Sequence, residues 1–121
     1  MHRVIHFEIR SPDPEAAGSF YSQVFGWTIT KKQTQDYWLI HTGTQTERGI
    51  NGGISKVEKK GKGIVPTVSV EDLKLHIQKV QENGGKVVKF PVTLSGTGYL
   101  AYCEDPEGNI FAILQYDSSA K

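Results

Sequence analysis

Two side chains near the N-terminus, His6 and Glu8, combine residue types and a spacing that suit acid–base chemistry. They stand two residues apart in a segment that alternates polar and apolar residues, so on a β-strand both would lie on one face. On such a face a carboxylate can orient an imidazole or raise its pKa, and the pair can then transfer protons. The same residues would also suit the polar wall of a binding cavity, and the sequence leaves both interpretations open.

Further polar and aromatic residues occupy segments from which they could contact a ligand. Imidazole and hydroxyl groups form hydrogen bonds, and aromatic rings can stack on a planar molecule, although aromatic residues in strands are often core or interface residues. The catalytic candidates are His6 and Glu8, and the ligand-binding candidates are His6, Glu8, His41, Thr67 and Tyr99. The aromatic supply also includes Trp27, Tyr37, Trp38 and Tyr102.

The other histidines and the single cysteine favour structural interpretations. His76 lies beside the apolar stripe of a predicted helix, and His2 belongs to the chain terminus. Cys103 is the one cysteine, so it cannot form an internal disulfide, and no neighbouring cations are present to lower its pKa. We expect it to pack as a small apolar residue.

The elements that must position these residues begin with a strand over residues 3–10. Asp13 then predicts a helix start, since its carboxylate can accept from free backbone amides and Pro14 needs no such partner. The helix is expected to end near Phe25, with Gly26 as its left-handed stop. Its predicted buried stripe is Ala17, Phe20, Tyr21 and Val24. Strands are expected over residues 27–32, 37–42 and 52–57.

The second half of the chain repeats this order at an offset of 59 residues. Asp13 and Asp72 are 59 residues apart, and so are Gly26 and Gly85. A strand over 64–70 is followed by a helix with the stripe Leu73, Ile77 and Val80, and by strands over 86–90, 99–104 and 110–115. The segment DPEG at 105–108 predicts a tight turn between the last two strands. The lysine-rich segment 58–63 reads as a solvated linker.

These patterns predict one α+β domain over residues 1–121, made of two tandem βαβββ repeats. Repeat one covers 1–57 and repeat two covers 64–117. We expect a curved mixed sheet that forms a cup, with the helices on its convex side and a small ligand on its concave side. We also expect a homodimer, because symmetric dimers are the commonest way to cover exposed sheet edges.

Charge and hydropathy exclude several partners. Lys and Arg total 14 against 13 Asp and Glu, so a net charge of +1 offers no footprint for nucleic acid or an anionic membrane. No segment resembles a signal peptide or a membrane span, which favours a cytoplasmic protein.

Blocks spread over nearly the whole chain resemble one known family. They are FY at 20–21 with GW at 26–27, NGG at 83–85, and EDPEGN at 104–109 followed by Phe111. Together they resemble the vicinal oxygen chelate superfamily, which contains glyoxalase I, bleomycin-resistance proteins and extradiol dioxygenases. The resemblance implies the cup-shaped βαβββ architecture described above.

The resemblance also implies a test for metal. Enzymes of the superfamily typically hold a divalent metal with four side chains, one from the first and one from the last strand of each repeat. The matching positions here are His6, Gly53, Val65 and Ala112. Only His6 can donate to a metal, and sites for such ions need about three or more protein donors. We therefore expect no cofactor; a divalent metal would require a rebuilt site in which Glu8 and His41 assist His6.

Three functional hypotheses follow. The first is a protein like the glyoxalase and bleomycin-resistance proteins that binds a small molecule in the cup without the usual metal tetrad. The second is a lyase or isomerase of the glyoxalase or epimerase type that uses a rebuilt metal site or His6 and Glu8 as acid and base. The third is a structural or regulatory module. The sequence identifies neither the ligand nor whether the protein is an enzyme.

Overall fold

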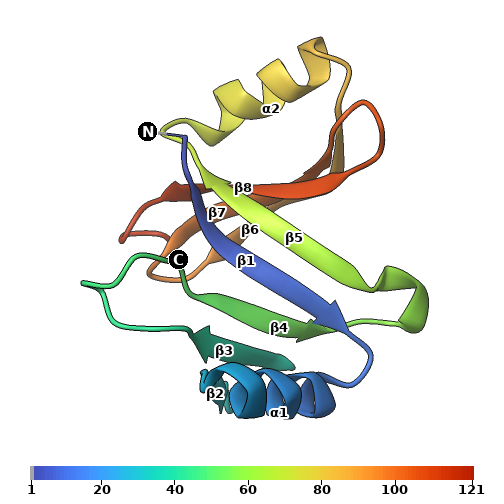
Figure 1. The fold of residues 1–121 in the computed structure, drawn as a ribbon. Helices are drawn as coiled ribbons and strands as arrows, with labels where there is room; N and C mark the ends of the chain where they lie inside the picture. Colours follow the sequence, from blue (N-terminus) through green and yellow to red (C-terminus); the bar gives the residue numbers. More distant parts are fainter. Residues whose placement is uncertain (1) are drawn as a thin grey trace. The chain divides into compact units, whose positions relative to one another are not determined.

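The computed structural model describes residues 2–121, with two helices and eight strands (Figure 1). The helices are α1 (Pro14–Phe25) and α2 (Leu73–Glu82). The strands are β1 (Val4–Ser11), β2 (Thr28–Lys31), β3 (Tyr37–His41), β4 (Gly52–Lys56), β5 (Gly63–Ser69), β6 (Lys86–Leu94), β7 (Gly98–Glu104) and β8 (Ile110–Tyr116). The described residues divide into two compact units, residues 6–65 and residues 66–121 together with residues 2–5.

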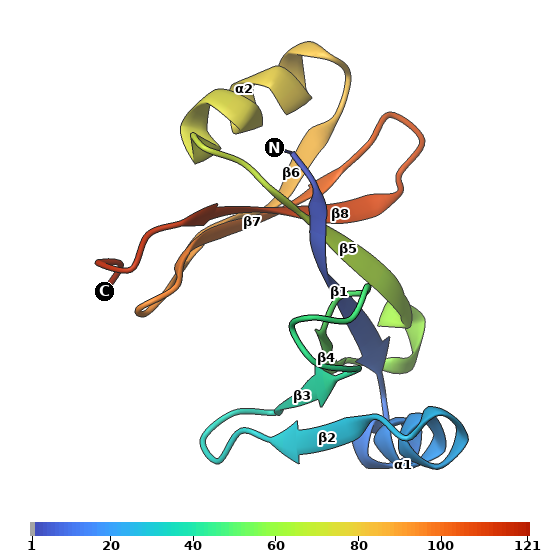
Figure 2. The same cartoon turned by 60° about the vertical axis from the view of Figure 1, so that its left-hand side comes forward.

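The unit formed by residues 6–65, called the N-terminal unit below, contains a mixed sheet in the order β2-β3-β4-β1. Strand β1 pairs in parallel with β4, while β2–β3 and β3–β4 are antiparallel pairs. Helix α1 packs on one face of this sheet, against β2 and β4 (Figure 2). This arrangement is one complete βαβββ repeat.

The other unit, called the C-terminal unit, has the same topology, with its strands in the order β5-β8-β7-β6. Strand β5 is parallel to β8, and the remaining pairs are antiparallel. The predicted α+β class and the two tandem βαβββ repeats are therefore confirmed. The compact units differ from the repeats in two places. The first residues of β5, up to Val65, group with the N-terminal unit, and Arg3 groups with the C-terminal unit, where its carbonyl accepts from the Ser69 amide at 3.0 Å.

Helix α1 starts and ends where its sequence signals predict. The Asp13 carboxylate accepts a hydrogen bond from the Ala16 amide at 3.1 Å, and Gly26 closes the helix in the left-handed conformation with φ 74°. The predicted buried stripe is only half right. Ala17 and Tyr21 contact the core, but the side chains of Phe20 and Val24 are 58% and 54% exposed.

Gly18 explains why Phe20 and Val24 face away from the sheet. It is buried, and a Cβ atom at this position would lie 3.1 Å from Ile29 and 3.6 Å from Ile54. The helix therefore approaches the sheet through its smallest residue. Phe20 and Val24 are turned out of the interface as a result.

Replacing Asp13 with alanine is expected to destabilise the protein by about 1 kcal/mol, because the first turn of α1 loses its side-chain acceptor. Urea unfolding monitored by circular dichroism would measure this loss. Asp13→Asn is the matched control, since an amide oxygen can still accept from the Ala16 amide, and it should stay close to the parent protein. Equal losses in both variants would contradict the capping role.

The core of the N-terminal unit lies between α1 and its sheet. Its buried members are Ile9, Trp38, Ile40 and Ile54, with Phe7, Ala17, Tyr21, Trp27 and Ile29 packed around them. Because residues alternate between the two faces of a strand, the neighbours of these core residues point to the opposite face. That face carries His6, Glu8 and Arg10 of β1, Tyr37 of β3 and Ser55 of β4, and we call it the polar face.

The C-terminal unit is built in the same way around α2. Its buried core is Val70, Leu73, Ala101, Cys103 and Ile113, packed against Ile77 and Val80 of the predicted helix stripe. Burial raises the pKa of the Cys103 thiol, so the expected structural role of this cysteine agrees with its position. The DPEG turn is also confirmed: the Gly108 amide donates to the Asp105 carbonyl at 3.0 Å.

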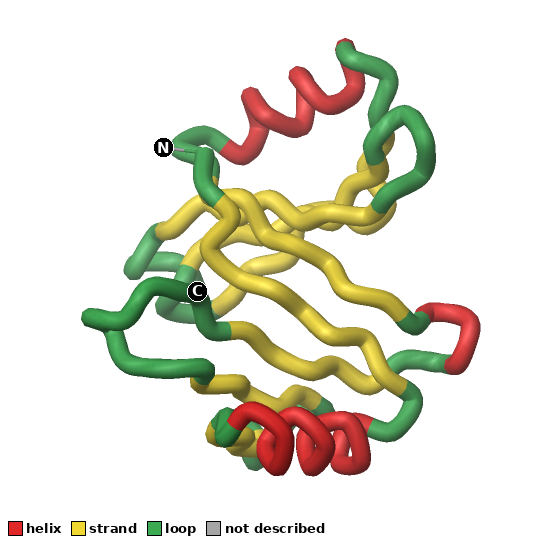
Figure 3. Tube along the Cα trace, in the orientation of Figure 1, coloured by secondary structure: helices red, strands yellow, loops and turns green. Residues whose placement is uncertain are grey.

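Two details of the elements differ from the sequence predictions. The linker contains a 3-10 helix, Lys59–Gly61, visible as a short red segment between β4 and β5 (Figure 3). Strand β6 continues past residue 90 to Leu94, with an irregular register between Lys89 and Val92. Pro91 lies within this irregular stretch and has no amide hydrogen for a regular ladder.

None of the described helices has the length and the apolar composition of a membrane-spanning segment.

Candidate functional site

The polar face of the N-terminal unit brings both catalytic candidates together. His6 and Glu8 lie two residues apart on β1, as the alternation predicts. Strand β4 runs beside them with Glu8 opposite Gly53 and Arg10 opposite Ser55. Strand β3 follows, with Tyr37 opposite Ser55. Three neighbouring strands therefore contribute side chains to one polar cluster.

Glu8 is a buried charge with hydrogen-bond donors beside it. Glu8 is only 8% exposed. Its Oε2 accepts a hydrogen bond from Arg10 Nε at 3.0 Å and another from Ser55 Oγ at 2.9 Å. A buried carboxylate is tolerated when it is paired and hydrogen-bonded. Arg10 and Ser55 satisfy this requirement, and neither was among the sequence candidates.

His6 contacts a residue that the sequence analysis counted only among the aromatics. Its Nε2 lies 2.9 Å from the Tyr37 hydroxyl. Tyr37 can occupy this position because residue 53 is glycine, since a Cβ atom on Gly53 would overlap the hydroxyl oxygen and Cζ of Tyr37. The one hint in the sequence was a glycine at position 53, which leaves space for a neighbouring side chain. The sequence did not indicate that Tyr37 would occupy that space.

The electrostatic setting keeps His6 and Tyr37 uncharged. Burial lowers the pKa of His6 below 6.5, and the Glu8 charge opposes that shift without reversing it. Burial also raises the pKa of Tyr37 well above 10, and here the Glu8 charge adds to the effect. At neutral pH the cluster therefore consists of a neutral imidazole, a neutral phenol and the Glu8–Arg10 ion pair.

Acid is expected to destabilise the protein through His6. Because the folded-state pKa of His6 lies below the unfolded value, the unfolded chain binds protons more readily as the pH falls below about 6.5. The contribution of neutral His6 to the free energy of unfolding is therefore complete above about pH 6.5. It is lost as the pH falls through the lowered pKa of His6. Thermal unfolding measured across this range should show a shallower decline for His6→Gln than for the parent chain. His2→Gln, at the terminus, is the control and should keep the parent slope.

The remaining ligand-binding candidates are not gathered at this cluster. His41 lies at the exposed end of β3, on the same strand face as Tyr37. Thr67 and Tyr99 belong to the C-terminal unit, where they lie on opposite faces of its sheet. Thr67 is buried on β5 opposite Ala112, whereas Tyr99 packs on the face that α2 covers.

Tyr99 instead lines a hollow of about 490 Å³ beside the start of α2. Its lining includes Leu73, Lys74, Pro91 and Gln115, and Gln115 is already engaged as an acceptor for the Leu73 amide at 2.8 Å. The hollow lies within the C-terminal unit, and Thr67 is not among the residues that line it.

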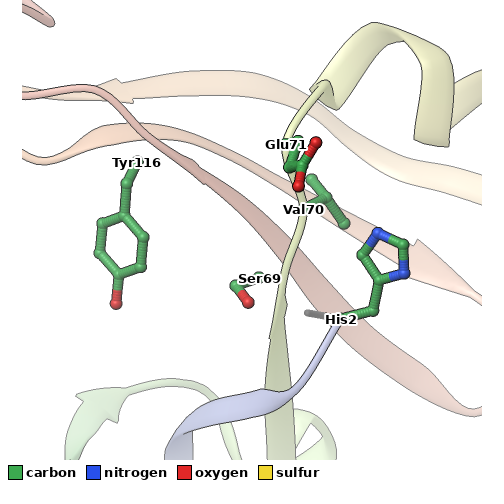
Figure 4. Close-up of a pocket in the computed structure, with 5 residues that line it drawn as sticks. All are labelled: His2, Ser69, Val70, Glu71 and Tyr116. Atoms are coloured by element: carbon green, nitrogen blue, oxygen red, sulfur yellow. The ribbon is translucent and has the colours of Figure 1, made fainter.

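A second hollow of about 380 Å³ lies near the chain terminus. In the view of Figure 4, His2 and Tyr116 stand on opposite sides of Ser69, with Val70 and Glu71 beside them. The His2 ring also meets the ring of His76 edge-on, 4.8 Å between centroids. None of the sequence candidates lines this hollow.

The residues at the four superfamily metal positions do not form a ligand set. Gly53 has no side chain and is covered by Tyr37, while Val65 and Ala112 are apolar and buried. His6 directs Nε2 at the Tyr37 hydroxyl. Within residues 2–121 no three His, Cys, Asp or Glu side chains come close enough to hold an ion. The rebuilt site with Glu8 and His41 therefore has no matching cluster in the described chain.

Comparison with known proteins places this geometry in a family. The model of the glyoxalase/bleomycin resistance protein/dioxygenase superfamily matches residues 3–113. A glyoxylase-like domain-containing protein of Didymella fabae is 34% identical, over 88% of this chain and 88% of its own. A probable lactoylglutathione lyase of Vibrio cholerae is 25% identical, over 94% of this chain and 91% of its own.

Solved structures share the fold at lower identity. A methylmalonyl-CoA epimerase in complex with methylmalonyl-CoA matches with a TM-score of 0.68 and 15% identity, covering 100% of this chain and 99% of its own. A superfamily member from Vibrio splendidus 12B01 matches with a TM-score of 0.68 and 19% identity, covering 97% of this chain and 100% of its own. Because the family model spans most of the sequence, this chain belongs to the glyoxalase/bleomycin resistance protein/dioxygenase superfamily.

Proposed function

We propose that this superfamily member binds a small organic molecule at the polar face of its N-terminal unit without a metal ion. The observation that carries this proposal is the His6–Tyr37 hydrogen bond of 2.9 Å, formed across the space left by Gly53. The Tyr37 hydroxyl is hydrogen-bonded to Nε2 of His6. It also fills the space that a metal-coordinating side chain at position 53 would need. This part of the face is therefore organised for hydrogen bonding to an organic ligand.

The residue chemistry at the other superfamily positions supports the same proposal. Zinc and related ions need about three or four nitrogen, oxygen or sulfur donors, and the side chains of Val65 and Ala112 supply none. Glu8, two residues from His6 on the same strand, is already engaged by Arg10 and Ser55. Drawing Glu8 toward a metal would break both contacts.

A second candidate is a lyase or isomerase in which His6 and Glu8 serve acid–base catalysis. It is favoured by one observation, namely that burial lowers the pKa of His6 so that the imidazole is neutral and can accept a proton near pH 7. The Vibrio cholerae relative is named a probable lactoylglutathione lyase. In this mechanism Glu8 would orient and stabilise a protonated His6, while Arg10 and Ser55 fix the carboxylate.

Metal analysis combined with ligand screening tests the proposal. Protein purified without chelators should contain far less than one equivalent of zinc, nickel, iron or manganese. A panel of uncharged and charged metabolites should include compounds that raise the melting temperature equally before and after dialysis against EDTA. Saturation at about a hundredfold excess over Kd corresponds to about 2.7 kcal/mol of added stability. Stoichiometric metal whose removal abolishes every such shift would overturn the proposal.

Variants then separate binding from catalysis. His6→Ala should weaken the thermal shift caused by a binding compound, whereas His2→Ala should not. If a binding compound is also converted to product, loss of turnover in His6→Ala at saturating compound would support the lyase or isomerase candidate. Unchanged turnover in that variant would exclude His6 as its acid or base.

We further propose that the protein forms a homodimer. The exposed side chains of Phe20, Val24 and Phe25 give α1 an apolar outer surface, and burial in a symmetric interface would remove it from water. Light scattering at micromolar concentration should report twice the chain mass. A monomeric mass would contradict this assembly.

A further inference from the structure

The hydrogen bond between His6 and Tyr37 joins two neutral groups, so either could be the donor. The direction of the bond determines which ring nitrogen carries the imidazole proton. That choice in turn decides whether His6 offers a donor or an acceptor to a ligand. The tautomer is therefore a functional property of this site.

Relative acidity favours Tyr37 as the donor. A phenol loses its proton with a pKa near 10, and a neutral imidazole N–H is far less acidic, so the phenol is the stronger hydrogen-bond donor. The pyridine-like nitrogen of neutral imidazole is also a better acceptor than a phenol oxygen. Tyr37 Oη–H therefore donates to His6 Nε2, and the imidazole proton resides on Nδ1.

The Nδ1–H group has no protein acceptor. Among the described residues the contact with Tyr37 is the only hydrogen bond of the His6 ring. Among residues 2–121, every side-chain nitrogen or oxygen that is buried has a hydrogen-bond partner. Because Nδ1 of His6 has none, it is not buried and is in contact with solvent. A donor held in place on one side and open on the other can serve a ligand.

The surrounding charges select the kind of acceptor. The polar face near His6 carries the Glu8 carboxylate and the Arg10 guanidinium, which form an ion pair at 3.0 Å. Tyr37 is protonated, and His41 is exposed at the end of β3. Because this pair is neutral overall, it offers an anionic ligand no net positive charge to offset the loss of its hydration, whereas an uncharged carbonyl oxygen needs only the Nδ1–H donor.

We infer that Tyr37 is a positioning residue that holds His6 in the Nδ1–H tautomer, so that His6 donates a hydrogen bond to an uncharged carbonyl oxygen of the ligand. This inference rests on the proposed metal-free binding function and names its substrate class. Gly53 is part of the same device, because its missing side chain gives the Tyr37 hydroxyl access to Nε2.

Imidazole nitrogen NMR tests the tautomer directly. Two-bond proton–nitrogen correlations on metal-free protein at neutral pH should show the protonated nitrogen of His6 at Nδ1. Tyr37→Phe removes the hydroxyl but keeps the ring, and it should shift His6 toward the Nε2–H form. Tyr116→Phe is the matched control, since Tyr116 is 62% exposed in the other unit, and it should leave His6 unchanged. An Nε2–H pattern in the parent protein, or an unchanged pattern in Tyr37→Phe, would overturn the inference.

Two ring compounds of similar shape test the ligand class. Cyclohexanone is an uncharged carbonyl probe, and cyclohexanecarboxylate is its anionic counterpart. Titration with cyclohexanone should move the His6 resonances, and its Kd should be weaker by about tenfold in Tyr37→Phe, as expected for the loss of one hydrogen bond. No response of His6 to cyclohexanone, or tighter binding of the carboxylate, would overturn the carbonyl assignment.

The outcomes distinguish this inference from the proposed function. Stoichiometric metal bound through His6 would defeat the metal-free function itself. A metal-free protein that shows the Nε2–H tautomer would defeat only the role assigned to Tyr37. A metal-free protein with the expected tautomer and carbonyl response would support both.

Discussion

Replacing Gly53 with alanine is expected to destabilise the protein by about 1–3 kcal/mol and to separate Tyr37 from His6. The added Cβ atom would overlap the hydroxyl oxygen and Cζ of Tyr37, which are part of a rigid ring that cannot yield by rotating its far end. Either the ring leaves or strands β3 and β4 move apart. Urea unfolding would measure the lost stability, and the imidazole resonances of His6 would report the lost contact.

Gly61→Ala is the matched control for this variant. A Cβ atom on Gly61 would lie 3.4 Å or more from Val57, which is an ordinary contact, so stability should change by only about 0.5 kcal/mol. Combining Gly53→Ala with Tyr37→Ala removes the clashing ring, and the double variant should lose less than the sum of the two single variants. Additive losses together with unchanged His6 resonances in Gly53→Ala would contradict the role of Gly53.

Replacing Ile54 with alanine is expected to cost about 2–5 kcal/mol, because the side chain is fully buried and its loss leaves a cavity. Ile54 lies on β4 between α1 and the neighbouring strands, and its side chain reaches Gly18 of the helix. The cavity would loosen the α1 side of the sheet whose other side carries Glu8 and Ser55. Denaturant unfolding and thermal melting would both detect a loss of this size.

Ile64→Ala makes the same chemical change at a residue that is 64% exposed in the same unit. Little apolar surface is uncovered there, so the expected loss is below about 1 kcal/mol and reflects the lower strand preference of alanine. Similar losses at both positions would show that Ile54 does not anchor the core. A large loss confined to Ile54→Ala is the expected result.

Local signals predicted the elements with good accuracy. Asp13 and Gly26 bound α1 because a capping carboxylate and a left-handed glycine act on their own backbone neighbourhood. Strands such as β3 and β7 began within one residue of their predicted positions. The offset of 59 residues then implied that the same topology occurs twice, and the two strand orders agree with that prediction.

Predictions that depended on packing were less accurate. Helical spacing marked Phe20 and Val24 as buried, yet Gly18 brings another side of α1 against the sheet. Spacing describes which residues share a helix face but not which face meets the sheet most closely. Alternation along β7 likewise does not reveal that Tyr99 lies on the side of the sheet that α2 covers.

The sequence by itself determined the doubled βαβββ fold, the placement of His6 and Glu8 on one strand face, and the absence of donors at Gly53, Val65 and Ala112. These features depend on residue identity and on the period of a strand, which are local properties. The tertiary structure alone decided that Tyr37 reaches His6 and that Arg10 and Ser55 hold Glu8. Tyr37 lies 31 residues from His6 along the chain, and Ser55 lies 47 residues from Glu8. Both contacts therefore depend on which strands pair and in what register. The space above Gly53 became a feature of the site only when β3 was paired beside it.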